Sequence, residues 1–201
     1  MKNIFFLLLP ILLVACSGQE TAKTDEETTN ESIETGTDVI EENVERKSPR
    51  QEASGEIYGL TIAIDYGSPR VKGREIWGEL VPYNEIWRAG ADEVTAVTFD
   101  KAAMIDGNQV DPGTYGLFII PKKDEPWTLV LNEEWSQDEH GVWGAYDYKE
   151  DKDVLRVDIE PQWQQESKEE MTFSISEAEG AIVFEWENAM LVIPVGPIVP
   201  A

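Results

Sequence analysis

Residues 56–201 of this 201-residue chain are predicted to form an all-β domain, an antiparallel β-sandwich or jelly roll with short helical turns. Apolar and polar residues alternate along several short segments, and turns rich in Gly, Pro and Asn separate these segments. No segment carries the apolar repeat of a long amphipathic helix. A single domain of ordinary size, preceded by targeting and linker residues, accounts for the length.

The alternation is clearest at residues 60–66, where apolar side chains occupy every second position. In a strand this spacing directs one row of side chains to a core and the other to solvent. The pattern predicts further strands at residues 93–100, 114–120, 127–131, 154–159, 171–176, 181–186 and 189–195. The Asp-Gly-Asn run at 106–108 predicts the turn of a hairpin, and residues 121–126 predict a second hairpin loop.

The first residues have the anatomy of a secretory signal. Lys2 precedes an apolar run at residues 4–14, which is too short to span a bilayer as a helix. The run ends in Leu13-Val14-Ala15-Cys16, which resembles a bacterial lipobox. Residues 1–15 are therefore predicted to be a lipoprotein signal peptide, and Cys16 to be lipidated as the mature N-terminus. The alternative is ordinary signal cleavage nearby, with Cys16 an incidental thiol.

Residues 16–55 are predicted to be a disordered acidic tether between the lipidated cysteine and the domain. This segment holds eleven acidic and four basic residues, few aliphatic residues and no aromatic residue. Such a composition buries too little apolar surface to offset the entropy lost on ordering, and its like charges repel each other. The tether is therefore expected to hold the domain at a distance from an envelope membrane.

Charge and composition exclude several functions. The formal net charge is −24, with 40 Asp and Glu against 16 Lys and Arg, so nucleic acid is not an expected partner. The single cysteine excludes an internal disulfide, and one cysteine and one histidine cannot build a His- or Cys-rich metal site. Neither a metal nor a cofactor is expected. His140 lies in a polar run and is expected in an exposed loop.

Residues 68–95 carry little clean periodicity and are predicted to be a structured connection that gathers basic, aromatic and acidic side chains. This stretch contains the runs SPRVKGR, IWGELVPY and WRAGADEVT, and PGTYGLFIIP, WTLVLN and WGAY follow in order. The six runs resemble the bacterial family called domain of unknown function 2911, over residues 56–195. The resemblance implies an exported, often lipid-anchored β domain, and it implies no established activity.

One position departs from that family. Its members typically carry Gly-Ala-Asn-Glu where this chain has Gly90-Ala91-Asp92-Glu93. An ionised Asp92 cannot donate the hydrogen bond that an amide donates, so a role in which that amide binds a ligand does not carry over to this chain.

Ten side chains are candidates for binding a ligand. The guanidinium groups suit a carboxylate, phosphate or sulfate, and the aromatic rings suit a sugar or a lipid headgroup. The candidates are Arg70, Arg74, Trp77, Trp87, Arg88, Asp92, Glu93, Tyr115, Trp143 and Tyr146. The alternatives are that the arginines form ion pairs with acids such as Asp65, Glu75, Asp92 and Glu93, and that the aromatic residues belong to the core.

Three functional hypotheses remain open at this point. The first is a lipid-anchored binding module of the bacterial cell envelope, expected on the outer membrane, that recognises a small anionic or carbohydrate-like ligand or an envelope protein. The second is a hydrolase-like enzyme in which Asp65 and Asp92 work beside Arg74. The third is a structural envelope protein. They differ in whether these groups converge in one open pocket.

We expect Cys16→Ala to yield an unlipidated protein that leaves the membrane fraction, because two or more acyl chains are needed for stable attachment, at about 0.8 kcal/mol for each buried methylene group. Fractionation followed by a high-salt wash tests this prediction. A Cys16→Ala protein that stays with membranes after the wash would contradict it.

Overall fold

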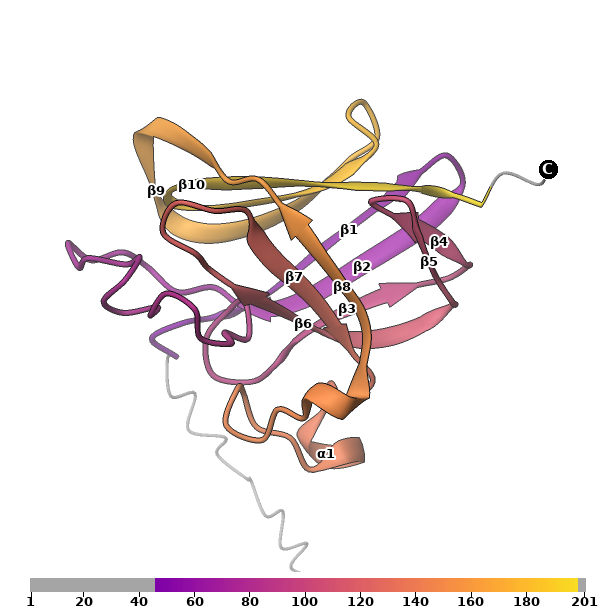
Figure 1. Ribbon diagram of the computed structural model, residues 1–201, viewed down its shortest axis with the longest axis horizontal. Coiled ribbons are helices and arrows are strands. Elements are labelled where there is room, and N and C mark those ends of the chain that lie inside the picture. Colours follow the sequence, from indigo (N-terminus) through magenta and orange to yellow (C-terminus); the bar gives the residue numbers. More distant parts are fainter. Residues whose placement is uncertain (1–45, 199–201) are drawn as a thin grey trace, which may run out of the picture. The chain divides into compact units, whose positions relative to one another are not determined.

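The computed structural model describes residues 46–198, which form two antiparallel β-sheets and almost no helix (Figure 1). The predicted signal peptide, Cys16 and most of the predicted tether lie outside the described residues. No helix within residues 46–198 is long and apolar enough to cross a membrane.

The larger sheet has six strands, in the spatial order β1 (Arg50–Ile57), β2 (Leu60–Gly67), β3 (Thr95–Phe99), β6 (Gly113–Ile120), β7 (Trp127–Asn132) and β8 (Asp153–Ile159). The smaller sheet has four, in the order β5 (Asn108–Val110), β4 (Ala103–Ile105), β10 (Ala181–Pro197) and β9 (Gln162–Ser176). The helical parts are α1 (Gln137–His140) and a 3-10 turn at Glu150–Lys152. The all-β sandwich prediction is thus confirmed.

The core lies between the sheets and takes its side chains from both. Ile62 and Ile64 of β2 are fully buried, as the alternation at residues 60–66 predicts, and so is Phe184 of β10. Aromatic rings form the centre of this core. Trp87 stacks on Trp186 with a centroid distance of 5.7 Å and an interplanar angle of 19°.

Most predicted strands are confirmed, and the differences have physical causes. The β4–β5 hairpin turns at Asp106-Gly107, and residues 121–126 connect β6 to β7. Strand β9 begins at Gln162, nine residues before its predicted start. The prediction missed these nine residues because they are all exposed and show no apolar alternation. The segments 181–186 and 189–195 are parts of one long strand, β10.

The larger sheet extends further toward the N-terminus than residue 56, where the sequence predicts the domain to begin. Strand β1 begins at Arg50, and all eight of its residues pair with β2. Its sequence, RQEASGEI, has a single large aliphatic residue, so its composition matches that of a solvated linker. Gly55 packs closely against Ile175 of β9, and an added Cβ there would lie 2.8 Å from the Ile175 Cβ.

A chain that starts at Glu56 should therefore be less stable than one that starts at Asn43. Removing most of β1 exposes the edge of β2 and the surface of Ile175. We expect a loss of at least about 1 kcal/mol in the free energy of unfolding, or roughly 2–4 °C in Tm for a domain of this size. Urea and thermal denaturation of the two chains measure this difference, and equal midpoints would show that β1 contributes nothing.

Candidate functional site

The connection between β2 and β3, residues 68–94, is held by backbone hydrogen bonds to several strands. Val71 N–H donates to the carbonyl of Glu169 (2.9 Å), and the carbonyl of Pro69 accepts from Met171 N–H (3.0 Å). Trp87 and Ile119 exchange two hydrogen bonds of 2.8 Å. The connection is therefore a fixed part of the sandwich, as the sequence predicts.

Two of the predicted ligand-facing aromatic residues belong to the core. Trp77 and Trp87 are only 7% and 9% exposed, so they do not form an open platform. Trp87 Nε1 donates to the carbonyl of Gly90 (3.1 Å), and Trp77 packs on Trp127 with a centroid distance of 4.5 Å. Both rings pack in the core, and Trp77 also lines one of the domain's pockets.

The three predicted arginines have three different environments. Arg70 forms an ion pair with Glu170 of β9, at an exposed position. Arg74 folds back on its own turn, where Nε donates to the carbonyl of Val71 (3.0 Å) and Nη2 to the carbonyl of Arg70. These two side chains therefore stabilise the connection, Arg70 through its ion pair with Glu170 and Arg74 through hydrogen bonds to carbonyls of its own turn.

Arg88 has no carboxylate within salt-bridge distance among residues 46–198, and its buried Nε lacks an acceptor. Burial lowers the pKa of Arg88, while Asp92, Tyr146 and Glu93 act in the opposite direction. Its aliphatic stem lies against Gly144, where an added Cβ would be 3.1 Å from Cδ. Arg88 thus links the loop of Asp92 to the loop of Trp143 and Tyr146.

Asp92 lies in the left-handed backbone region, at φ 63°. Asn and Asp are the residues other than glycine that adopt this region most readily. This backbone conformation is enough to explain why either Asn or Asp occupies the position, so the choice of residue is no evidence for ligand binding.

A first pocket, the Trp143 pocket, has a volume of about 260 Å³. Its lining residues are Arg50, Asp65, Glu93, Val94, Ala96, Trp135, Ser136, Gln137, Asp138 and Trp143. Its main charged groups are already paired, Arg50 with Asp65 (2.6 Å) and Glu93 with Arg46 (2.7 Å). Burial acts to raise the pKa of Glu93, but its own backbone N–H and the nearby Arg46 and Arg50 lower it overall.

A polar network fixes the segment that carries Trp135 and Trp143. The Asn132 amide donates to Asp153 Oδ1 and to the carbonyl of Lys149, both at 2.8 Å. The Tyr148 hydroxyl donates to Asp153 Oδ2 (2.6 Å), and burial together with this bond raises the pKa of Tyr148 to about 12.

His140 does not lie in an exposed loop. It ends helix α1 and is half-buried against the ring of Trp135. Its Nδ1 accepts a hydrogen bond of 3.4 Å from Trp135 N–H.

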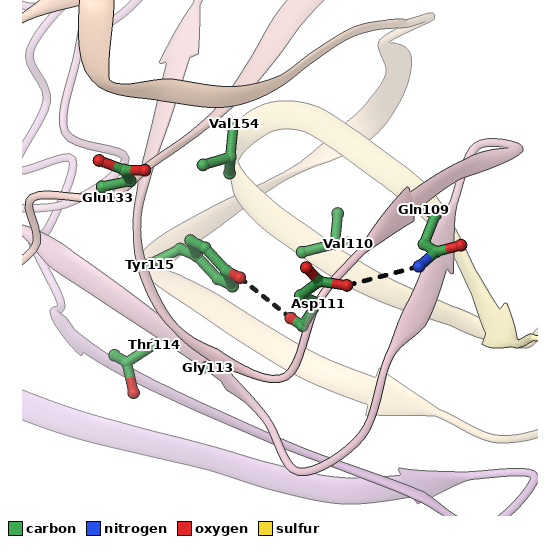
Figure 2. A pocket seen from close by; sticks show the side chains of 8 residues that line it. All are labelled: Gln109, Val110, Asp111, Gly113, Thr114, Tyr115, Glu133 and Val154. Carbon is green, nitrogen blue, oxygen red and sulfur yellow. Dashed lines mark hydrogen bonds between the residues drawn. The ribbon is translucent and has the colours of Figure 1, made fainter.

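A second pocket, the Tyr115 pocket, has a volume of about 510 Å³ and lies between the β5–β6 turn and the start of β8 (Figure 2). Its polar groups also have partners within the chain. The Tyr115 hydroxyl donates to the carbonyl of Asp111 (3.0 Å), and the Gln109 amide donates to the Asp111 carboxylate (3.4 Å). Glu133, on the opposite wall, pairs with Lys152 at 3.5 Å. Burial, followed by Asp111 and Glu133, raises the pKa of Tyr115.

A third pocket, the Trp77 pocket, has a volume of about 250 Å³. Its lining residues are Arg74, Glu75, Ile76, Trp77, Tyr83, Trp163, Glu187 and Asn188. Three segments that are distant in sequence meet there, namely the connection, the start of β9 and the middle of β10. Two of the predicted binding residues, Arg74 and Trp77, belong to this pocket.

Strand pairing is irregular at this pocket. The β9–β10 register shifts on both sides of Glu187, and Glu187 itself adopts φ 52°, which is unusual for a residue with a large side chain. Such irregularities re-aim side chains and occur next to functional sites more often than elsewhere in sheets. Here both Glu187 and its neighbour Asn188 line the pocket.

The Trp77 pocket differs from the other two in having two buried neutral polar atoms without a partner among residues 46–198, whereas the one buried unbonded atom of the Trp143 pocket, Arg50 Nη1, lies 3.6 Å from the Glu93 carboxylate. Trp77 Nε1 and Asn188 Oδ1 are buried and have no hydrogen-bond partner. Within the described residues, the carboxylates of Glu75 and Glu187 have neither a salt bridge nor a hydrogen bond. An unpaired buried polar group costs about 1–3 kcal/mol, so Trp77 Nε1 and Asn188 Oδ1 distinguish this pocket as the best candidate site of the three.

Tyr83 forms one wall of this pocket and is held by the turn before it. The Gly78 N–H donates to the carbonyl of Val81 (2.9 Å), and Gly78 adopts φ 94°. The Tyr83 ring lies directly over Gly78, since an added Cβ would be 2.8 Å from its Cε2. Burial raises the pKa of Tyr83, and Asp124, Glu75 and Glu187 add to the shift.

The groups proposed for a hydrolase do not share any of the three pockets described for residues 46–198. Asp65 lines the Trp143 pocket, Arg74 lines the Trp77 pocket, and Asp92 lines neither. Residues 46–198 also contain no group of three or more His, Cys, Asp or Glu side chains placed to hold a metal ion.

Three residues of the Trp77 pocket were missed from the sequence. Trp163 is the one large aromatic side chain in the polar run that opens β9 and is 48% exposed. Glu187 and Asn188 fill the gap between the two predicted strands 181–186 and 189–195. An aromatic residue in a polar strand and a break in alternation were the available signals.

Comparison with known proteins places the chain in one family. The model of a family described as protein of unknown function (DUF2911) matches residues 48–195. The chain therefore belongs to this family, as the six sequence runs predict, and the match includes all of β1. No curated protein and no solved structure matches the chain.

We expect Gly78→Ala to destabilise the domain more than Gly73→Ala. Both glycines have positive φ, and an added Cβ meets nothing within 4 Å at Gly73 but meets the Tyr83 ring at Gly78. Gly73→Ala should cost about 1–2 kcal/mol of unfolding free energy, from the backbone alone. Gly78→Ala should cost at least about 1 kcal/mol more, from the clash. Urea denaturation measures both values, and equal losses would rule out the tight Tyr83 contact.

Proposed function

We propose that this domain is a binding module and that the Trp77 pocket receives a small, carbohydrate-like ligand. The observation that carries the proposal is the set of unpaired polar groups beside a half-exposed indole ring, that of Trp163. A sugar hydroxyl both donates and accepts a hydrogen bond, so one ligand can satisfy the Trp77 N–H and the Asn188 carbonyl oxygen once neighbouring side chains shift to admit it, because both atoms are closed to water in this structure.

The shape of the pocket favours a single ring. Its volume of about 250 Å³ lies below the range of roughly 300–1,000 Å³ for drug-sized ligands. Trp163 and Tyr83 offer apolar surface to the C–H groups of a pyranose, while Glu75, Glu187 and Asn188 offer acceptors to its hydroxyl groups.

The charge of the pocket decides between the two ligand classes expected from the sequence. Two unpaired carboxylates line it, and the Nε and Nη2 donors of its one cation, Arg74, are bound to the chain's own carbonyls. An anionic ligand would meet repulsion there, and the whole chain carries a net charge of −24. A carbohydrate-like ligand is therefore favoured over an anionic one.

The proposal includes the envelope location expected from the sequence. A lipid anchor at Cys16 would hold the module on an envelope membrane of the bacterium, and the tether would let the pocket reach ligands away from the lipid surface. Nothing in this role requires a cofactor.

We expect Trp163→Ala to weaken sugar binding at least about tenfold, which corresponds to about 1.4 kcal/mol. The probes are glucose, galactose, mannose, N-acetylglucosamine and glucosamine, each titrated calorimetrically into the full-length protein in detergent micelles. Trp143→Ala is the matched control, because Trp143 is exposed to a similar degree (40%) but lines another pocket.

Two outcomes would contradict the proposal. One is that none of the five sugars binds, and the other is that Trp143→Ala weakens binding as much as Trp163→Ala does.

A further inference from the structure

We infer that the ligand of the Trp77 pocket carries a protonated amine, so that the pocket selects an amino sugar over its neutral analogues. This inference rests on the proposed function and names the chemical class of ligand for that same site. It is carried by the charges, the aromatic surface and the unpaired neutral groups that line the pocket.

The two acidic side chains that line the Trp77 pocket, Glu75 and Glu187, form no ion pair within residues 46–198. Some acids of the domain form ion pairs, for example Glu93 with Arg46, Glu170 with Arg70 and Glu134 with Lys149, and other exposed acids, such as Glu79, form none with a described residue. The pocket therefore presents two carboxylates without an ion-pair partner in the part of the chain that the structure describes, and a single cation, Arg74, so negative charge is in excess.

Among the described residues, the basic side chains near Glu75 and Glu187 form no ion pair with them, because each is engaged elsewhere. Arg74 uses Nε and Nη2 to close its own turn. Lys168 stands opposite Glu187 in the strand register, but its ammonium group pairs with Glu185 at 3.3 Å. A cation from a ligand would thus meet no competing internal ion pair at Glu75 and Glu187.

Tyr83 shares the pocket with these carboxylates and lies within their field. Its pKa is raised first by burial and then by Asp124, Glu75 and Glu187. Asp124 belongs to the β6–β7 loop, whereas Glu75 lies in the connection and Glu187 in β10. Acidic groups thus surround the Tyr83 hydroxyl from three parts of the fold.

The pocket also offers an exposed aromatic surface, that of Trp163. Trp163 stands edge-on against Trp127, with a centroid distance of 5.9 Å and an interplanar angle of 80°, and remains 48% exposed. Indole is the strongest cation–π partner among the aromatic side chains, and an ammonium group over such a ring gains about 0.5–2 kcal/mol. Free carboxylates beside an exposed indole match a protonated amine.

The unpaired neutral groups of the pocket explain why the amine belongs to a sugar ring. Trp77 is more than nine-tenths buried and lines the pocket, and its N–H has no acceptor. The carbonyl oxygen of Asn188 has no donor. A simple ammonium ion offers no acceptor to the Trp77 N–H. The hydroxyl groups of a sugar ring can both accept from the Trp77 N–H and donate to the Asn188 carbonyl oxygen.

The experiment compares glucosamine with N-acetylglucosamine, because the two share one ring and differ in a charged amine against a neutral amide. Each is titrated calorimetrically into the full-length protein in detergent micelles at low salt. We expect glucosamine to bind at least about tenfold more tightly, with a preference that shrinks as salt is added, since salt screens charge–charge attraction.

Variants locate the effect. Glu187→Gln should remove most of the preference for glucosamine while N-acetylglucosamine still binds. Glu79→Gln is the matched control, because Glu79 is an exposed carboxylate of the same connection that does not line the pocket, and its removal changes the net charge equally. The preference should be unchanged in that control.

The possible failures are distinguishable. Equal affinity for glucosamine, N-acetylglucosamine and glucose would overturn this inference and leave the proposed carbohydrate binding intact. A preference that survives Glu75→Gln and Glu187→Gln together would overturn it as well, as would choline chloride competing as strongly as glucosamine. Absence of binding by every sugar would overturn both proposals.

Discussion

Tight packing of aromatic rings between the two sheets is the interaction on which the rest of the domain depends. Trp77 and Trp87 come from the connection, Trp127 from the larger sheet, and Phe184 and Trp186 from the smaller one. The ring centroids of Trp77 lie 4.5–6.4 Å from those of the other four. Because each such ring buries about 150–250 Å² of surface, this cluster ties a segment without regular structure to both layers of the sandwich.

The same packing determines what the Trp77 pocket can be. One wall is a tryptophan that the core holds in place, so this wall is ordered before any ligand arrives and adds little to the entropy cost of binding. The cost appears elsewhere, in an indole N–H without an acceptor and in the left-handed backbone at Glu187. Features of this kind persist where the surrounding structure over-determines them, and they occur most often at binding sites.

Sequence reasoning recovered the sandwich because buried strands carry an alternation that burial itself imposes, as in β2 and β8. It missed β1 and the first half of β9, since an edge strand with exposed side chains has no apolar face to reveal it. The candidate site was recovered in part. Arg74 and Trp77 were found from composition, but Trp163, Glu187 and Asn188 join them only through strand pairing over long sequence separations.

Strand β1 also gives the domain a mechanical property. With an anchor at Cys16, any drag on the domain enters the body through Arg50, at the outer edge of the larger sheet. The ladder between β1 and β2 is then the element under load, and the aromatic core is not. Detaching those eight residues would add about 26–29 Å of extended chain to the link while the remaining nine strands stay paired. Strand β1 could then yield under force before the core of the domain unfolds.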